Sequence, residues 1–155
     1  LASKQAQTRY LDLFKSNGVA PERITLRAHV NSLADHLNLY KEVDIGLDPF
    51  PYHGTTTTCE ALLMGTPVLT LAGNRHSCRV GVSLLRSTNL HDWIAQDTNE
   101  YIAKAVYFAA NPRPSRTQIR KQFQESPLCN TSRFTQNLET LFEELVISRL
   151  RTLMT

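Results

Sequence analysis

Three short aliphatic runs at similar spacing most constrain what this chain can fold into. They are RITL at 23–26, VDIGL at 43–47 and PVLTL at 67–71, and a stretch of helical character follows each run. Strands that alternate with helices of this length are typical of βαβ units, in which right-handed crossovers join parallel strands. We therefore predict an α/β fold with a Rossmann-like parallel sheet flanked by helices, and a short edge strand or turn around 90–94.

The stretches between these runs carry the signals that begin and end helices. Residues 6–15 place apolar side chains on one helical face, and Asn17-Gly18 is expected to end this helix. Ser32 is the predicted N-cap of the next helix, in which Leu33 and Leu37 are expected to face inward. Further helices are expected from within 55–58 to Gly65, and over 78–85, 101–110 and 115–124.

A long helix is expected from Ser132 onward, so that 131–155 form a closing C-terminal helix of one domain that spans 1–155. Its apolar side chains recur at helical spacing. They form a stripe that consists of Phe134, Leu138, Leu141, Phe142, Leu145 and Val146. We expect this stripe to pack in the core, with an absent partner domain as the alternative surface.

Size and composition limit the functional classes. A length of 155 residues fits one domain, and a net charge of +3 with scattered basic residues argues against nucleic acid as the main ligand. No apolar run approaches the roughly 20 residues that cross a bilayer, so no membrane partner is expected. Cys59, Cys78 and Cys129 form no CxxC pair, which argues against a zinc site or a disulfide framework. Without a secretory signal, these cysteines favour a cytoplasmic location.

The segment DIGLDPFPYHGTTTTCEALLMGTPVLT, residues 44–70, carries the chemistry. A strand leads through a loop into a helix that begins among four threonines, and ligands of open α/β sheets bind beyond the carboxyl ends of the strands. The first N–H groups of a helix have no intrahelical partner, and the helix dipole adds positive charge there. Gly54 lets the backbone come close to a ligand. We predict a metal-free diphosphate site at Thr55, Thr56 and Thr57.

Simpler interpretations of the same helix remain open. Thr55 alone would suffice as an N-cap, with the other threonines facing solvent. Four β-branched residues in a row exceed that need and disfavour a helix, so a ligand explains them better. Glu60, one turn into the helix, is placed to accept hydrogen bonds from a ribose hydroxyl pair. It is equally interpretable as an ordinary surface glutamate.

This segment resembles the donor-binding region of O-linked N-acetylglucosamine transferases and their bacterial and plant SPINDLY relatives. The resemblance rests on HGTTTTCEALLMGTPVLTL with DIGLDPFPY before it, continues through SCRVGVSLL at 77–85, and resumes at SPLCNT, residues 126–131. It implies a GT-B architecture, in which two Rossmann-like domains face a cleft and this chain belongs to the C-terminal, donor-binding half.

The resemblance also implies an activity. It is the metal-independent, inverting transfer of N-acetylglucosamine from UDP-GlcNAc to Ser or Thr of proteins, with no cofactor; some SPINDLY relatives use GDP-fucose instead. The implied partners are the nucleotide-sugar donor, an N-terminal GT-B domain, TPR repeats of a longer protein and a protein acceptor. No catalytic residue is assigned, because the family's candidate general base lies upstream, and the isolated chain is expected to be little active.

The resemblance assigns residues to the donor site. Thr55, Thr56 and Thr57 match the diphosphate-binding positions, and Thr55 stands where animal enzymes have a histidine. Glu60 matches an acidic ribose-binding position, and His36 matches a histidine that lies near the nucleotide.

Other residues carry weaker signals. His53, beside Gly54, is expected either to reach the phosphates or to cap the loop, and Arg79 either faces the cleft or forms an internal ion pair. Leu33 stands where the animal enzymes have a lysine, so one nucleotide contact is lost or replaced.

The main alternative function is a non-catalytic Rossmann-like module that binds a partner protein through its terminal helix. A redox dinucleotide domain and a P-loop NTPase are disfavoured, since no GxGxxG follows a strand and no GxxxxGK precedes a Ser or Thr.

Overall fold

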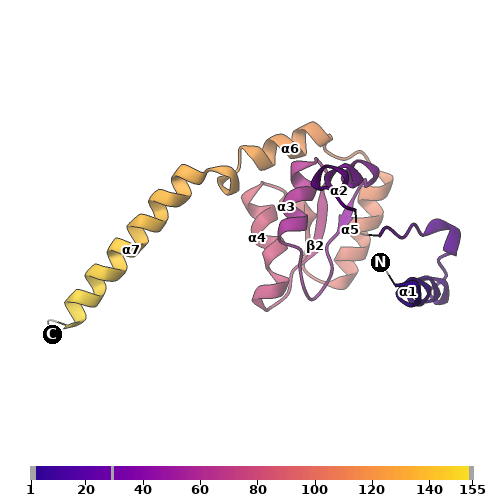
Figure 1. The fold of residues 1–155 in the computed structure, drawn as a ribbon, viewed down its shortest axis with the longest axis horizontal. Coiled ribbons are helices and arrows are strands. Elements are labelled where there is room, and N and C mark those ends of the chain that lie inside the picture. Colours follow the sequence, from indigo (N-terminus) through magenta and orange to yellow (C-terminus); the bar gives the residue numbers. More distant parts are fainter. Residues whose placement is uncertain (1–2, 29, 154–155) are drawn as a thin grey trace. The chain divides into compact units, whose positions relative to one another are not determined.

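The computed structural model describes residues 3–28 and 30–153, which belong to two compact units, Leu1–Asn38 and Leu39–Thr155. The first unit holds helix α1 (Lys4–Ser16), a 3-10 turn (Pro21–Arg23) and most of helix α2 (Leu33–Leu39), as Figure 1 shows. The second unit holds the sheet and the remaining helices.

Local signals set the ends of the helices in the first unit. Gly18, with φ of +80°, ends α1 and donates its N–H to the carbonyl of Lys15 at 3.0 Å. The predicted cap of α2 is confirmed, because the Ser32 hydroxyl accepts from the Asp35 N–H at 3.0 Å. Leu33 was wrongly expected to face inward, since 68% of its surface is exposed.

The prediction of a strand at 23–26 is also wrong. This segment leaves the 3-10 turn with extended backbone at Ile24 (φ −108°, ψ 118°), yet no strand is formed there within the described part of the first unit. A β-strand needs a neighbouring strand to pair with, and both elements that flank this segment are helical.

The second unit is built on a three-stranded parallel sheet in the order β1 (Gly46–Leu47), β2 (Val68–Leu71) and β3 (Ile94–Ala95). Gly46 lies opposite Val68, and Thr70 lies opposite Ile94. The two later runs of the sequence therefore pair as expected, although β1 keeps only the last two residues of 43–47. The predicted α/β class with a parallel sheet is confirmed.

Helices surround this sheet at the predicted places. They are α3 (Thr56–Leu63), α4 (Val80–Ser87), α5 (Thr98–Ala110) and α6 (Arg116–Gln124), with short 3-10 turns at Tyr40–Glu42, His76–Cys78, His91–Trp93 and Pro127–Cys129. In Figure 1, α3 and α4 lie on one side of β2 and α5 lies on the other. Gly65, with φ of +77°, ends α3, and its missing side chain leaves room for the backbone of Arg116.

The core joins the sheet to these helices. Leu62, Leu69, Leu85 and Ile119 are completely buried, and they come from α3, β2, α4 and α6. Trp93, the single tryptophan, stacks on Phe108 with ring centroids 3.9 Å apart and an interplanar angle of 9°. Burial of this apolar surface is the main source of the unit's stability.

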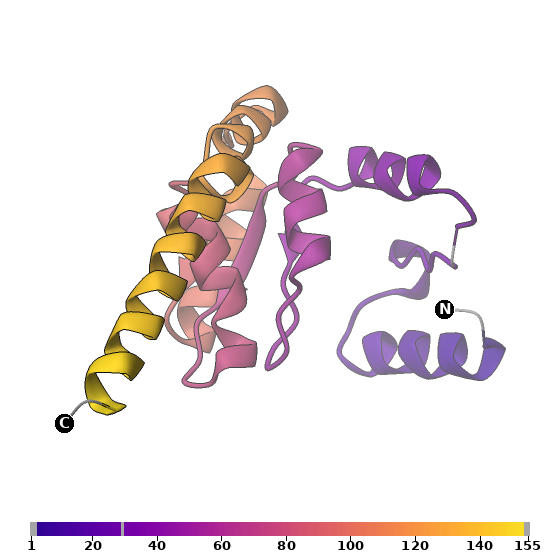
Figure 2. The same cartoon turned by 60° about the vertical axis from the view of Figure 1, so that its left-hand side comes forward.

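Helix α7 (Thr131–Leu153) follows, and its apolar stripe is not in the core. Every described residue of α7 is exposed, and Phe134 and Phe142 expose 66% and 58% of their surfaces. The expected core packing of this stripe is therefore wrong for the part of the chain described here. Figure 2 shows the helix as one continuous rod. Neither α7 nor any other described helix combines the length and the apolar character that crossing a membrane requires.

Candidate functional site

The candidate site lies where the parallel strands end. Asp48 follows β1, Gly73 lies just beyond β2, and α3, α4 and α5 begin after the connecting loops. Because the carboxyl ends of parallel strands meet at one edge of a sheet, the N-termini of the helices that follow point toward that edge. The sequence-predicted threonines belong to the first of these N-termini.

Thr55 is the N-cap residue of α3, and the next two threonines open its first turn. The side chains of Thr55, Thr56 and Thr57 are exposed, and the Thr55 hydroxyl makes no capping bond. Thr58 differs, because it is buried and donates its hydroxyl to the carbonyl of Gly54 at 3.1 Å. Three exposed hydroxyl-bearing residues and the first-turn N–H groups that have no intrahelical partner thus lie at the N-terminus of one helix.

Gly54 is required by the tightness of the turn before α3. A side chain there would collide with the Thr57 hydroxyl and lie 2.9 Å from the Thr58 hydroxyl oxygen. Its N–H donates to Asp48 Oδ1 at 2.8 Å, which fixes the direction of the loop as it enters the helix. Gly54 therefore lets the backbone pack against its own threonines, as a close-approach glycine does.

The first turn of α3 holds no carboxylate of its own, while the buried Asp48 carboxylate binds the Gly54 N–H just before it. The N-terminus of α5 is the opposite case, because Asp97 caps it by accepting from the Glu100 N–H at 2.9 Å, and Glu100 adds a second carboxylate. The dipole of α5 is thus neutralised by its own first turn, whereas the first turn of α3 supplies no acidic side chain for this purpose.

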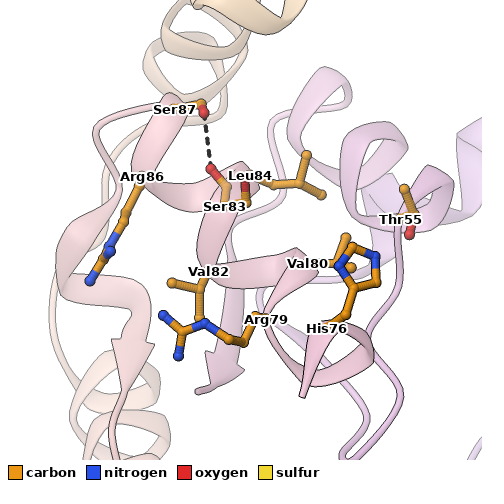
Figure 3. A pocket seen from close by; sticks show the side chains of 9 residues that line it. All are labelled: Thr55, His76, Arg79, Val80, Val82, Ser83, Leu84, Arg86 and Ser87. Carbon is orange, nitrogen blue, oxygen red and sulfur yellow. Dashed lines mark hydrogen bonds between the residues drawn. The ribbon is translucent and has the colours of Figure 1, made fainter. Parts of the chain in front are cut away.

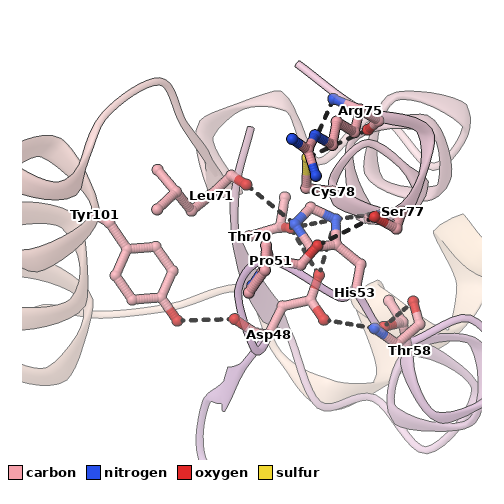
Figure 4. Close-up of polar contacts among 12 residues, drawn as sticks. Asp48, Pro51, His53, Thr58, Thr70, Leu71, Arg75, Ser77, Cys78 and Tyr101 are labelled. Atoms are coloured by element: carbon pink, nitrogen blue, oxygen red, sulfur yellow. Dashed lines mark hydrogen bonds and ion pairs between the residues drawn. The ribbon is translucent and has the colours of Figure 1, made fainter. Parts of the chain in front are cut away.

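Behind the threonines lies a buried polar network that the sequence did not predict. Asp48 is 5% exposed, and its Oδ2 accepts from the Thr70 hydroxyl at 2.7 Å. His53 is 2% exposed, and its Nδ1 lies 3.4 Å from the same carboxylate oxygen. The Tyr101 hydroxyl reaches the Asp48 carbonyl at 3.4 Å from α5. Figure 4 shows Asp48, Thr70 and His53 gathered at the sheet edge.

Both ring nitrogens of His53 are engaged inside the protein. Nδ1 accepts from the Gly81 N–H at 3.1 Å, and Nε2 lies 3.0 Å from the Leu71 carbonyl. Of the two roles expected for His53, the loop-holding one has contacts in the structure. A direct contact from His53 to phosphate remains a prediction.

Glu60 lies on α3 beside Tyr40, whose hydroxyl is 3.2 Å from both Glu60 Oε2 and the Thr57 carbonyl. Burial, followed by the charge of Glu60 and the hydrogen bond to it, raises the pKa of Tyr40 to about 12. Tyr40 therefore stays neutral and orients the half-buried Glu60 carboxylate on the second turn of α3. The contact of Glu60 with a ribose remains a prediction.

An open pocket of about 700 Å³ adjoins Thr55 and runs along α4. Figure 3 shows His76, Arg79 and Arg86 around it together with Ser83. Arg79 is exposed and donates to the Gly73 carbonyl at 2.9 Å. Arg79 forms no ion pair within the described residues, and its expected position facing the cleft remains a prediction.

His36 lies on α2 in the first unit and is partly buried. Its backbone N–H donates to the Ser32 carbonyl at 3.0 Å. The predicted place of His36 near the nucleotide involves both units and remains a prediction.

Together the fold and the site define an α/β domain of the Rossmann-like class, in which a helix N-terminus with three exposed threonines lies at the edge of a parallel sheet. The model of the family described as "Glycosyl transferase family 41" matches residues 4–138, and the chain belongs to this family.

Relatives in this family agree with that assignment. The chain is 39% identical over 140 residues to a Petunia hybrida protein and 37% identical over 140 residues to one from Solanum lycopersicum. Both bear the name "Probable UDP-N-acetylglucosamine--peptide N-acetylglucosaminyltransferase SPINDLY". Each match covers 88% of this chain but only 15% of the relative. The chain thus spans a small part of the length of these relatives.

A solved structure supports the fold. The O-GlcNAc transferase of Thermobaculum terrenum, solved as a mutant, matches with a TM-score of 0.84 and 30% identity. The match covers 92% of this chain and 28% of that chain. The predicted fold class, a Rossmann-like sheet from the C-terminal half of a GT-B architecture, is confirmed by this neighbour and by the parallel sheet.

Proposed function

We propose that this chain is the donor-binding part of a metal-independent, inverting glycosyltransferase that moves N-acetylglucosamine from UDP-GlcNAc to Ser or Thr of proteins. The names of the relatives support the donor and the peptide acceptor. The observation that carries the proposal is the N-terminus of α3, where Thr55, Thr56 and Thr57 are exposed and no acid or capping side chain occupies the first turn.

The chemistry follows from this arrangement. Transfer of the sugar leaves a nucleoside diphosphate, and negative charge develops on its terminal phosphate as the glycosidic bond breaks. Backbone N–H groups at a helix N-terminus and threonine hydroxyls stabilise that charge without a metal ion or a cofactor. Glu60 is the proposed acceptor for the ribose hydroxyls, and His36 is proposed to contact the nucleotide from α2.

The chain does not carry every part of the proposed activity. Metal-free departure of a diphosphate needs cationic donors, and losing one such donor typically costs about 100- to 1000-fold in rate. We propose that these donors, the general base and the acceptor site lie in an N-terminal GT-B domain and in TPR repeats of a longer protein. The isolated chain then binds its donor weakly and turns it over little.

The compartment is proposed on chemical grounds. Cys59, Cys78 and Cys129 are all free thiols. Free thiols are typical of a reducing compartment, so we propose the cytoplasm.

An NMR titration with uridine diphosphate tests the proposal. We expect millimolar binding that shifts the amide signals of Thr56 and Thr57 first. Thr56→Ala is expected to weaken it at least about tenfold, since it removes a hydrogen bond to a charged group. Guanosine diphosphate, titrated in parallel, distinguishes a GDP-sugar donor.

Thr98→Ala is the matched control. Thr98 is an exposed threonine that opens α5 just as Thr56 opens α3, so both substitutions change helix propensity equally. The α5 N-terminus already holds two carboxylates, and binding should be unchanged. Undiminished binding by Thr56→Ala, or no binding of either diphosphate by the wild-type chain, would refute the diphosphate assignment.

A further inference from the structure

Asp48 and His53 are buried polar residues for which the proposed chemistry has no direct use. Neither side chain is open to solvent, since Asp48 is 5% and His53 is 2% exposed. Burying polar side chains costs free energy unless their hydrogen bonds are satisfied. The partners of these two side chains therefore show what they hold in place.

The hydrogen bonds of His53 define its proton position. Gly81 donates its N–H to Nδ1, so Nδ1 carries no hydrogen and the ring proton is on Nε2, which donates to the Leu71 carbonyl. His53 thereby connects the loop before α3 to the end of β2 and to the first turn of α4. The backbone adds a further tie, because the His53 N–H donates to the Ser77 carbonyl at 2.9 Å.

Asp48 ties the same loop from its other end. One carboxylate oxygen holds the Gly54 N–H, and the other holds the Thr70 hydroxyl on β2. The packing leaves no spare room, since a side chain on Gly81 would lie 2.5 Å from both Asp48 Oδ2 and the Thr70 hydroxyl oxygen. The first turn of α4 therefore rests directly on the aspartate.

We propose that Asp48 and His53 are positioning residues that hold the N-termini of α3 and α4 in register with the sheet edge, so that the anion-binding groups are in place before the ligand arrives. This inference rests on the proposed function. A loop that contains Pro49, Pro51 and Gly54 would otherwise be ordered by the ligand, and that ordering cost would weaken binding. The hydrogen bond from the Gly81 N–H to His53 Nδ1 is the contact that connects α4 to the loop before α3.

Three variants of His53 separate positioning from general stability. His53→Ala removes both ring contacts. His53→Asn places Oδ1 near the position of Nδ1, so the Gly81 N–H keeps an acceptor while the donor to Leu71 is lost. His53→Gln places an amide nitrogen near the position of Nε2, so the donor to the Leu71 carbonyl is kept while the acceptor for the Gly81 N–H is lost.

Two readouts are measured on each variant: uridine diphosphate affinity by NMR titration, and hydrogen exchange of the Gly81 amide without ligand. We expect His53→Ala and His53→Gln to bind about tenfold more weakly and to exchange the Gly81 amide faster, as loss of a buried acceptor predicts. His53→Asn should bind within about twofold of the wild-type chain and keep Gly81 protected. Unfolding midpoints should fall in both the Asn and the Gln variants, because each loses one buried contact.

The outcomes distinguish the inference from the proposed function. If the wild-type chain binds and Thr56→Ala does not, but His53→Ala binds normally, the positioning role alone is overturned. It is also overturned if affinity follows the unfolding midpoint in all three variants, with Asn and Gln equally weakened. If the wild-type chain binds no nucleoside diphosphate, the proposed function fails and this inference fails with it.

Discussion

Replacing Asp48 by alanine tests whether the buried network holds the second unit together. The carboxylate accepts from the partly buried Gly54 N–H at 2.8 Å and from the buried Thr70 hydroxyl at 2.7 Å. Asp48→Ala leaves these two donors without their acceptor. It also leaves a small cavity between β2 and the first turn of α4.

The size of the effect follows from these contacts. A buried hydrogen bond to a charged group contributes about 1.5–3 kcal/mol, and a buried donor left unsatisfied costs about 1–3 kcal/mol. The Thr70 hydroxyl lies 3.3 Å from His53 Nδ1, but the single lone pair of Nδ1 already accepts from the Gly81 N–H, so Thr70 gains no full replacement for its bond to Asp48. We therefore expect Asp48→Ala to lower the free energy of unfolding by about 3 kcal/mol.

Urea unfolding of the chain measures this loss. Trp93 is buried against Phe108, so its fluorescence reports the core of the second unit. With a slope of about 2 kcal/mol per M of urea, 3 kcal/mol moves the midpoint down by roughly 1.5 M. The slope itself should change little if the native surface is kept.

Asp44→Ala is the control on the same segment. Asp44 is 78% exposed at its side chain and pairs with Arg113 at 3.3 Å, and exposed ion pairs contribute about 0–1 kcal/mol. Equal midpoints for Asp48→Ala and Asp44→Ala would refute the claim that the buried contacts of Asp48 stabilise the fold.

Two further predictions concern titratable side chains. The pKa of Tyr40 rises from 10.0 to about 12 on folding, so the contribution of Tyr40 to the free energy of unfolding is present below pH 10 and is lost as pH rises from 10 toward 12. The unfolding midpoint of Tyr40→Phe should therefore fall less over that range than the midpoint of the wild-type chain. Equal falls would contradict this. Burial, then the neighbouring Cys129 and Glu60, raises the pKa of the Cys59 thiol, so thiolate is scarce there. Iodoacetamide followed by mass spectrometry should label exposed Cys129 first and buried Cys78 last, and early labelling of Cys78 would contradict the packing around the 3-10 turn His76–Cys78.

Much of the second unit was predictable because its signals are local. The run at 67–71 carries a continuous aliphatic pattern and becomes β2, and the threonines followed by Gly65 mark the start and the end of α3. N-caps, helix-ending glycines and apolar periodicity act through residues within one or two turns. Ser32 and Gly18 were predictable for the same reason.

The errors arose where the outcome depends on distant residues. The run at 23–26 has strand-like residues, but within the described residues no neighbouring strand pairs with it, and a strand without a partner is not formed. The stripe on α7 has the period of a buried helix, yet periodicity does not state which surface covers it.

The sequence by itself determined the class of fold, the helix that opens on Thr55 and the run of threonines that we propose to bind a diphosphate. Only the tertiary structure decided that His53 turns inward and that Asp48, Thr70 and Gly81 meet around it. Asp48 and Gly81 are 33 positions apart, and no local pattern connects them. Their meeting follows from the pairing of β1 with β2 and from the packing of α4 on the sheet, which are decided by the whole core at once.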